Sequence, residues 1–240
     1  MFRHTTVHAI LAILMVALIG MGQAISAGAT DEVAVEASLQ DTLKQLLSQK
    51  DKHASDPSVL VRLADVYLDL GDDPAGEQSA RKAFYDKGAQ AAKEAIGLQE
   101  QNADAHYLYA ANLGSAAQLT GLMASAWTVK ELKQHVDRAL ALKPDHAPAL
   151  HMKGMMLEEL PWVLGGDADG ALAHLKRAVA ADPDHIHTRL DLAKVYLKRK
   201  DQTAARKELD VILSRPLNST ASARERRHRD EAQRLLSTAK

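Results

Sequence analysis

The chain has 240 residues, of which 46% are hydrophobic, 25% are charged and only 4% are aromatic. This length is sufficient to bury a substantial core, and the formal net charge of −1 gives no general electrostatic reason to bind nucleic acid or an anionic membrane. Because the sequence contains no cysteine, disulfides, thiol catalysis and cysteine-ligated metal centres are excluded.

Residues 1–29 have the pattern of a secretory signal peptide. Arg3 precedes a short apolar run over residues 9–20, and the small residues Ala27 and Ala29 follow it. The run is too short to span a bilayer comfortably, so we expect cleavage after Ala29 and a soluble periplasmic or secreted protein. An uncleaved membrane anchor is the alternative, whereas a lipid anchor on an N-terminal cysteine is excluded.

Residues 30–56 are expected to form an N-terminal helix and a linker. Leucines recur there at helical spacing, at Leu39, Leu43, Leu46 and Leu47. Two Asp-Pro pairs, Asp56-Pro57 and Asp73-Pro74, then predict helix starts. A carboxylate caps a helix N-terminus, and proline fits the first helical position.

An internal repeat covers most of the remaining chain. Three segments align without gaps from Ala95, Ala139 and Ala178, and each crosses a polar turn before a new helix begins. Each new helix carries a small residue, at Ala110, Gly154 and Ala193, and a weaker fourth copy places Ala64 there. A larger apolar residue follows each of them at helical spacing. Small residues facing large ones allow helix pairs to pack closely, and recurring helix pairs build a tetratricopeptide-like solenoid.

We therefore predict an all-α fold. Residues 57–216 should form a tetratricopeptide-like helix-pair solenoid of about four irregular repeats with inserted segments. Residues 217–240 should form a C-terminal capping helix that covers the last exposed face. Within the solenoid, Thr128 and Glu131 predict a capping box that opens the helix beginning beside them.

The turn after residue 159 is larger than a simple reversal requires. Pro161 should end one helix, Gly165 and Gly166 should permit a sharp turn, and Asp167 should cap the next helix. These four residues explain the shape of the turn but leave the tryptophan within it unexplained.

Trp127 and Trp162 are the only tryptophans, and we expect both on one edge of the solenoid. One hypothesis is that the turn folds over this edge and, with Trp127, makes an apolar pocket wall or partner surface. The alternative is that Trp162 fills a gap left by an oversized repeat. We favour the second hypothesis, because large aromatic side chains usually fill cores.

A family resemblance is carried by residues 160–197, LPWVLGGDADGALAHLKRAVAADPDHIHTRLDLAKVYL. This stretch resembles the T-component of TRAP (tripartite ATP-independent periplasmic) transporters, as do residues 79–96 and 107–114. The resemblance implies a non-catalytic periplasmic accessory protein that binds the solute-receptor protein, with a small hydrophobic or organic-acid ligand as a further possibility. Residues 130–154 also resemble the eukaryotic regulator of microtubule dynamics family.

The alternative function is that of a general exported tetratricopeptide scaffold. Such a protein would mediate protein–protein contacts in envelope assembly or cofactor maturation. Self-association into a homo-oligomer stays open under either hypothesis. We expect no enzymatic activity, because the carboxylates and histidines form no recognisable nucleophile or phosphate-loop motif.

The eleven histidines raise the question of a metal site. His146 and His151 are five positions apart, and His185 and His187 are two apart. No cysteine assists them, and the His-Glu-x-x-His spacing of many zinc sites does not occur. We therefore expect solvated histidines at helix starts and turns, with no metal and no cofactor.

The first helix of each pair should line the concave face of the solenoid. The residues expected to face inward are Leu68, Tyr107, His151, Met155, Leu190 and Lys194. With Trp127 and Trp162, they are our candidate ligand- or partner-binding residues. They predict a mixed apolar groove with few charges, suited to a helix, a protein loop or a hydrophobic small molecule. The alternative is that inserted segments fill the groove.

Overall fold

The computed structural model describes residues 37–51, 56–73, 76–121, 126–216 and 223–238. Residues 37–51 are helical. The elements that follow are α2 (Pro57–Gly71), α3 (Gln78–Leu98), α4 (Ala103–Thr120), α5 (Ala126–Leu142), α6 (Ala147–Glu159), the short 3-10 helix η2 (Trp162–Leu164), α7 (Ala168–Ala181), α8 (Ile186–Lys198), α9 (Gln202–Ser214) and α10 (Ala223–Thr238). Every regular element in these ranges is a helix, which confirms the predicted all-α class.

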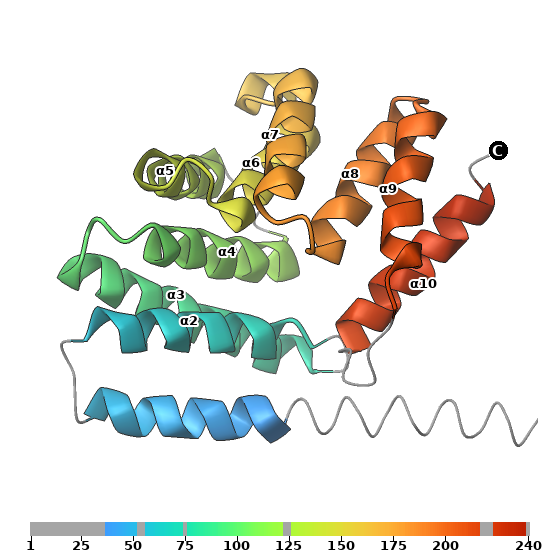
Figure 1. The fold of residues 1–240 in the computed structure, drawn as a ribbon. Helices are drawn as coiled ribbons and strands as arrows, with labels where there is room; N and C mark the ends of the chain where they lie inside the picture. Colours follow the sequence, from blue (N-terminus) through green and yellow to red (C-terminus); the bar gives the residue numbers. More distant parts are fainter. Residues whose placement is uncertain (1–36, 52–55, 74–75, 122–125, 217–222, 239–240) are drawn as a thin grey trace, which may run out of the picture.

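The helices pack as successive pairs: α2 with α3, α4 with α5, α6 with α7, and α8 with α9 (Figure 1). The pairs are stacked one after another, as in a tetratricopeptide solenoid. Helix α10 packs against both α8 and α9, which confirms the predicted capping helix. At the other end, leucines of the 37–51 helix join the core that α2, α3 and α4 share.

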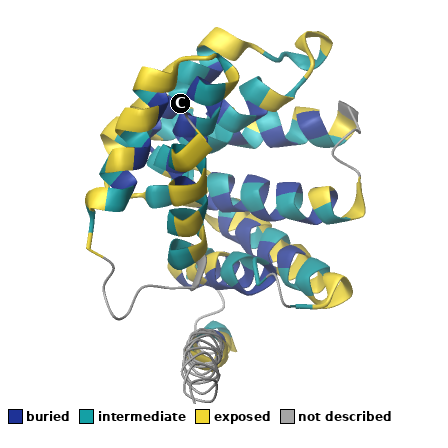
Figure 2. Ribbon diagram, turned by 90° about the vertical axis from the view of Figure 1, so that its right-hand side faces the viewer, coloured by how far each residue is buried: buried dark blue, intermediate teal, exposed yellow. Residues whose placement is uncertain are grey.

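The small residues of the repeat lie at the closest helix contacts. Ala64, Ala110 and Ala193 have no exposed surface, and buried residues follow the inward sides of the helices (Figure 2). A Cβ atom on Gly154 would lie 2.7 Å from Cγ of Leu175, so α6 and α7 approach each other too closely for a larger side chain. The repeat pattern therefore identified the packing seam between helices.

The predicted helix starts have mixed outcomes. Asp56 caps α2, and its carboxylate accepts a hydrogen bond of 2.9 Å from the Ser58 backbone N–H. The start at Asp73 is wrong, because α2 runs to Gly71 and the chain needs the following residues to turn before α3 begins at Gln78.

The capping box at residues 128–131 is also wrong. Helix α5 is already formed at Ala126, so Thr128 lies inside it and caps nothing. The Glu131 carboxylate instead accepts a hydrogen bond of 2.6 Å from the Tyr109 hydroxyl on α4. A contact between helices has replaced the local interaction that the sequence spacing suggested.

The long turn has the predicted local structure. Helix α6 ends before Pro161, and Gly165 has a left-handed φ of 91°. A Cβ atom on Gly166 would lie 1.8 Å from the Leu160 carbonyl oxygen, so only glycine fits there. Asp167 caps α7 by accepting hydrogen bonds of 3.1 Å from the N–H groups of Asp169 and Gly170.

The predicted signal peptide lies outside the described residues, as does most of the segment between α9 and α10. Among the helices of the described part of the chain, none combines the length and apolar character that crossing a membrane requires.

Candidate functional site

A cleft of about 840 Å³ lies along the first helices of the pairs. Helices α2, α4 and α6 supply most of its walls, and the start of α8, the N-terminal part of α5 and the long turn complete it. Its apolar surface comes from Leu68, Tyr107, Ala111, Val129, Pro148, Met152, Met155, Met156, Leu160, Pro161 and Leu164. The inserted segments therefore border the cleft without filling it.

The structure separates the six predicted groove residues into two groups. Leu68, Tyr107, His151 and Met155 line the cleft. Leu190 does not: it has no exposed surface and belongs to the core that α8, α9 and α10 share. Lys194 also lies outside the cleft lining, and its ammonium group contacts Asp191 at 3.2 Å and Glu231 at 3.0 Å. Its position on α8 faces α10, because Glu231 belongs to that helix.

The cleft is more acidic than the sequence predicted. Its lining includes the carboxylates of Asp65, Asp69, Asp72 and Glu159, whereas none of the described lining residues is lysine or arginine. Desolvation, and then the negative charge of Asp104, raise the pKa of Asp65 above its usual value. The expectation of few charges is wrong because α2 and α6 bring together acidic residues that are distant in sequence.

Both tryptophans are exposed, Trp127 by 72% and Trp162 by 84%. The hypothesis that Trp162 fills a gap in the core is therefore wrong. The neighbouring residues Val163, Leu164 and Gly165 form a shallow hollow with Val129, Lys130 and Lys133 of α5. The turn thus lies against the start of α5, which is also where Trp127 is found. A role for this edge in binding stays a prediction.

The repeated Pro-Asp-His sequence produces two histidine caps. Nδ1 of His146 accepts a hydrogen bond of 3.1 Å from the Ala149 N–H, and His185 caps α8 in the same way through Thr188. Asn102 holds the equivalent place before α4. His146 is only 3% exposed, so the prediction of a solvated histidine is right about the helix start and wrong about the solvent.

Burial of His146 is compensated by a second hydrogen bond. Its Nε2 lies 2.8 Å from an Asp104 carboxylate oxygen on α4. This hydrogen bond outweighs desolvation and lowers the pKa of Asp104. The cap of α6 therefore also joins the second helix pair to the third.

Four further ionisable groups meet where α6, α8 and α10 come together. Nε2 of His151 lies 2.9 Å from Oδ2 of Asp191, and Nε2 of His187 lies 3.2 Å from the same oxygen. The ring of His228 stacks on that of His187 with the centroids 4.6 Å apart. We call this group the histidine cluster: His151, His187, Asp191 and His228.

The charges in the histidine cluster are strongly coupled. Burial alone would raise the pKa of Asp191, but the hydrogen bond from His151, the two neighbouring imidazoles and the Lys194 ammonium group lower it to about 2. Desolvation lowers the pKa of His187 to about 4 despite the attraction of Asp191. Sequence spacing paired His185 with His187, but it had no means of finding Asp191 or His228.

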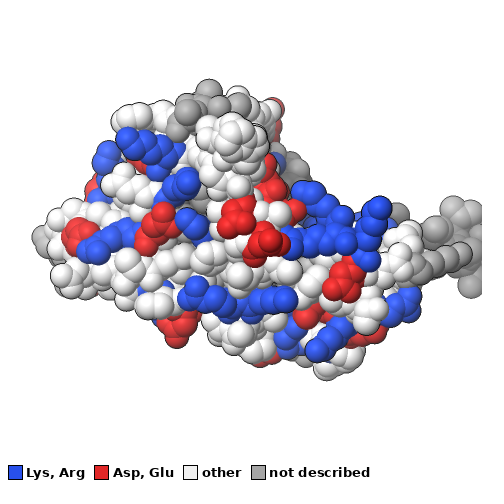
Figure 3. Space-filling model, turned by 90° about the horizontal axis from the view of Figure 1, so that it is seen from above, with Lys and Arg blue, Asp and Glu red and all other residues white. Residues whose placement is uncertain are grey.

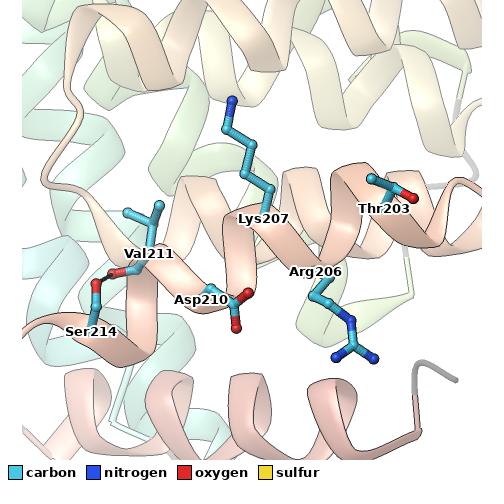
Figure 4. Close-up of a pocket in the computed structure, with 6 residues that line it drawn as sticks. All are labelled: Thr203, Arg206, Lys207, Asp210, Val211 and Ser214. Carbon is cyan, nitrogen blue, oxygen red and sulfur yellow. Dashed lines mark hydrogen bonds between the residues drawn. The ribbon is translucent and has the colours of Figure 1, made fainter.

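Two other surfaces are less suited to binding. A shallow hollow along α9 is lined by Thr203, Arg206, Lys207, Asp210, Val211 and Ser214. Figure 4 shows that the long side chains there diverge, with Lys207 and Arg206 pointing to opposite sides of the helix. Across the face in Figure 3, positive and negative side chains are intermixed. This face therefore offers no continuous basic surface of the kind that nucleic acid requires.

The helix pairs, the stacking and the concave cleft define a tetratricopeptide-type repeat protein. A tetratricopeptide repeat model matches residues 164–224. The crystal structure of a thermophilic TPR protein from Thermus thermophilus superposes with a TM-score of 0.61 at 16% identity, covering 87% of this chain and 97% of that one. The likeness confirms the fold.

The model of the regulator of microtubule dynamics protein 1-3 family matches residues 29–158, more than half of the chain. The chain belongs to this family. Bovine regulator of microtubule dynamics protein 1 is 28% identical over 181 residues, which cover 69% of this chain and 57% of the bovine protein. Bovine protein 3 is 26% identical over 187 residues, covering 71% and 40%. This chain thus spans about half the length of these relatives.

These findings correct the transporter assignment. The resemblance to the TRAP T-component is wrong, because the family match and the similar proteins are regulators of microtubule dynamics. The resemblance of residues 130–154 to that second family is confirmed. Residues 160–197, which suggested the transporter protein, fall largely within the tetratricopeptide match instead. A solute-receptor partner therefore has no support.

Proposed function

We propose that this protein is a non-catalytic scaffold that binds a segment of a partner protein in the cleft. The observation that carries the proposal is the composition of the cleft. An apolar surface formed by α2, α4 and α6 is bordered by four carboxylates and contains no lysine or arginine among its described lining residues. A complementary segment carries apolar side chains together with at least one lysine or arginine.

The apolar surface would supply most of the affinity. Leu68 and Tyr107 lie on neighbouring helices, and Met155 lies on the next helix of the stack. Methionine side chains adapt to differently shaped partners, and a volume of about 840 Å³ accommodates several side chains of a peptide. The exposed ring of Trp162, within the turn that borders the cleft, is available to extend this surface.

The carboxylates would supply selectivity and orientation. Charges at the rim of an interface mainly steer association and discriminate against the wrong charge. Because Asp65 and Glu159 are on α2 and α6, they can fix a basic side chain at either wall of the cleft. Binding should therefore weaken as salt concentration rises, since exposed charges are screened.

Selection from a displayed random-peptide library tests this proposal. Peptides enriched on the immobilised full chain should combine apolar residues with lysine or arginine. For a selected peptide, Asp65→Asn and Glu159→Gln should each weaken binding about two- to fivefold, and Leu68→Ala should weaken it roughly tenfold or more. Asp210→Asn, on the outer face of α9, is the matched charge control and should have no effect.

The proposal fails if the selected peptides are acidic, or if all three cleft substitutions leave peptide binding unchanged while the variants remain folded. The names of the relatives connect them with microtubule dynamics. We carry over to this chain only the coarser role of binding a protein partner, because the tetratricopeptide architecture supports it directly.

We further propose, from residues 1–29 alone, that the protein is exported and acts as a scaffold outside the cytoplasm. Sequencing the N-terminus of the protein purified from its native cells tests this proposal. A mature chain that begins at residue 30 supports export, and an intact N-terminus recovered from the cytoplasm contradicts it.

A further inference from the structure

We propose that His151, His187 and Asp191 form a divalent transition-metal site, with zinc as the metal that best fits the donors. The three residues come from two different helix pairs, and their donor atoms all lie within 4.8 Å of one another. This site goes beyond partner binding, because it assigns a ligand to a group of residues that a peptide scaffold does not need.

The donor set matches the preferences of zinc. Two imidazole nitrogens and one carboxylate oxygen are typical zinc ligands, and three protein ligands leave a fourth position for water or another group. At metal–ligand distances of about 2.0–2.2 Å, tetrahedral geometry places neighbouring donor atoms about 3.4 Å apart. The two histidines already lie 2.9 and 3.2 Å from Oδ2 of Asp191, so these pairs need to separate by only a few tenths of an ångström.

The surrounding structure holds these donors in place. His187 and Asp191 are one turn apart on α8 and therefore point to the same side of the helix. The carboxylate of Asp191 is only 8% exposed and His151 only 15%. In the metal-free state, a hydrogen bond joins His151 to the Asp191 carboxylate, and Nε2 of His187 lies 3.2 Å from the same oxygen. Zinc would take the place of the proton between these donor atoms.

Two neighbouring groups modify the site. Lys194 contacts Oδ1 of Asp191 at 3.2 Å, which leaves Oδ2 on the side of the histidines. The Lys194 ammonium group also forms an ion pair with Glu231 at 3.0 Å. This ion pair partly neutralises its charge, so it repels a metal ion less strongly than an isolated ammonium group would. His228 on α10 is stacked on His187, and rotation of its side chain would be required before it supplied a fourth ligand.

A metal ion here would add a further link between two helix pairs that already share an apolar core around Leu175 and Leu192. Besides the hydrogen bond between His151 and Asp191, α6 and α8 are connected by the ion pair of Glu158 with Lys198, at 2.6 Å. His151 and His187 also line the cleft, so the metal would lie in the cleft wall. Zinc should therefore stabilise the fold, since a ligand that binds only the native state raises its unfolding free energy.

The test uses the full chain without an affinity tag, first stripped of metal and then titrated with zinc against a chromophoric chelator. We expect one zinc ion per chain at this site. His151→Gln, His187→Gln and Asp191→Asn should each weaken zinc binding by at least about tenfold. His174→Gln, on α7 and outside the cluster, is the matched control and should bind zinc as the parent does.

The inference is overturned if the parent does not bind zinc, or if all three folded variants retain its affinity. Crystals of the unaltered chain soaked in zinc give a second measurement that no folding defect can obscure. An anomalous scattering peak between His151 and His187 supports the site, whereas no peak, or peaks only elsewhere, refutes it. Neither measurement involves a peptide, so a failure here is distinct from a failure of the proposed scaffold function.

Discussion

The contact between Gly88 and Asn112 offers the sharpest test of how the first two helix pairs are held together. Gly88 lies near the middle of α3, and a Cβ atom added there would be 2.1 Å from Oδ1 of Asn112 on α4. Asn112 has no exposed surface, and its Nδ2 donates hydrogen bonds to Ala64 of α2 at 3.1 Å and to Leu108 at 2.9 Å. It therefore cannot move aside without losing bonds to two helices.

Opposing effects decide the sign of the Gly88→Ala substitution. Alanine in a helix interior is favoured over glycine by about 1 kcal/mol. Overpacking costs about 1–3 kcal/mol, and the loss of two hydrogen bonds by Asn112 costs about 1 kcal/mol each. The net expectation is a loss of about 2–4 kcal/mol in the free energy of unfolding. For a chain of this size, this lowers the melting temperature by roughly 10 °C.

Gly97→Ala is the matched control in the same helix. No atom lies within 4 Å of a Cβ placed at Gly97, so only the gain in helix propensity applies. This variant should be more stable than the parent by about 0.5–1 kcal/mol. Thermal and urea unfolding, followed by circular dichroism, measure both variants. If Gly88→Ala is as stable as Gly97→Ala, close packing between Gly88 and Asn112 is refuted.

A double substitution identifies the responsible contact. In the Asn112→Ala background, the side chain that opposes a Cβ at position 88 is absent, so adding Gly88→Ala should cost at least about 1 kcal/mol less than it does in the parent. Equal costs in both backgrounds would mean that Asn112 is not the obstacle.

Three further substitutions probe other parts of the molecule. Trp162→Ser should change the free energy of unfolding by less than about 0.5 kcal/mol. In the parent protein, acrylamide should efficiently quench the part of the fluorescence that this substitution removes. A large destabilisation would mean that the ring is packed. Leu175→Ala should cost about 2–5 kcal/mol, because Leu175 is fully buried at the α6–α7 contact, and a smaller loss on unfolding in urea would contradict that packing. Burial, followed by the hydrogen bond to Asp72, raises the pKa of Tyr85 to about 12 from 10.0. As pH rises, the unfolded state therefore loses the Tyr85 proton before the folded state does. The contribution of this proton to the free energy of unfolding is complete below pH 10 and is lost as pH rises towards 12. Tyr85→Phe should remove this part of the decline in stability at alkaline pH, and an unchanged decline would contradict the raised pKa of Tyr85.

Local signals predicted local structure where no tertiary contact or chain reversal competed with them. Asp56 and Asp167 cap helices as expected, because a cap depends on residues within one turn of the helix. The buried alanines of the repeat were also predictable, since their spacing records a packing seam. The predicted capping box at Thr128 failed where a tertiary contact competed, because Glu131 bonds to Tyr109 on another helix.

The candidate site was harder to predict because it combines distant residues. The acidic character of the cleft arises only when α2 and α6 border the same space. The histidine cluster likewise needs residues from α6, α8 and α10. The spacing of residues along one segment carries no information about contacts between distant helices. For this reason the histidines were expected to be solvated.

Repeat symmetry explains both the success and the failure of the groove prediction. Tyr107, His151 and Leu190 are equivalent, each five positions after the residue that caps its helix. The first two line the cleft, whereas Leu190 is buried against residues of α9 and α10. In the last pair, the capping helix therefore covers the position that remains open in the earlier pairs. Helix α10 also places the ring of His228 against that of His187. The histidine cluster therefore forms where the open cleft ends and where α10 begins to cover the solenoid.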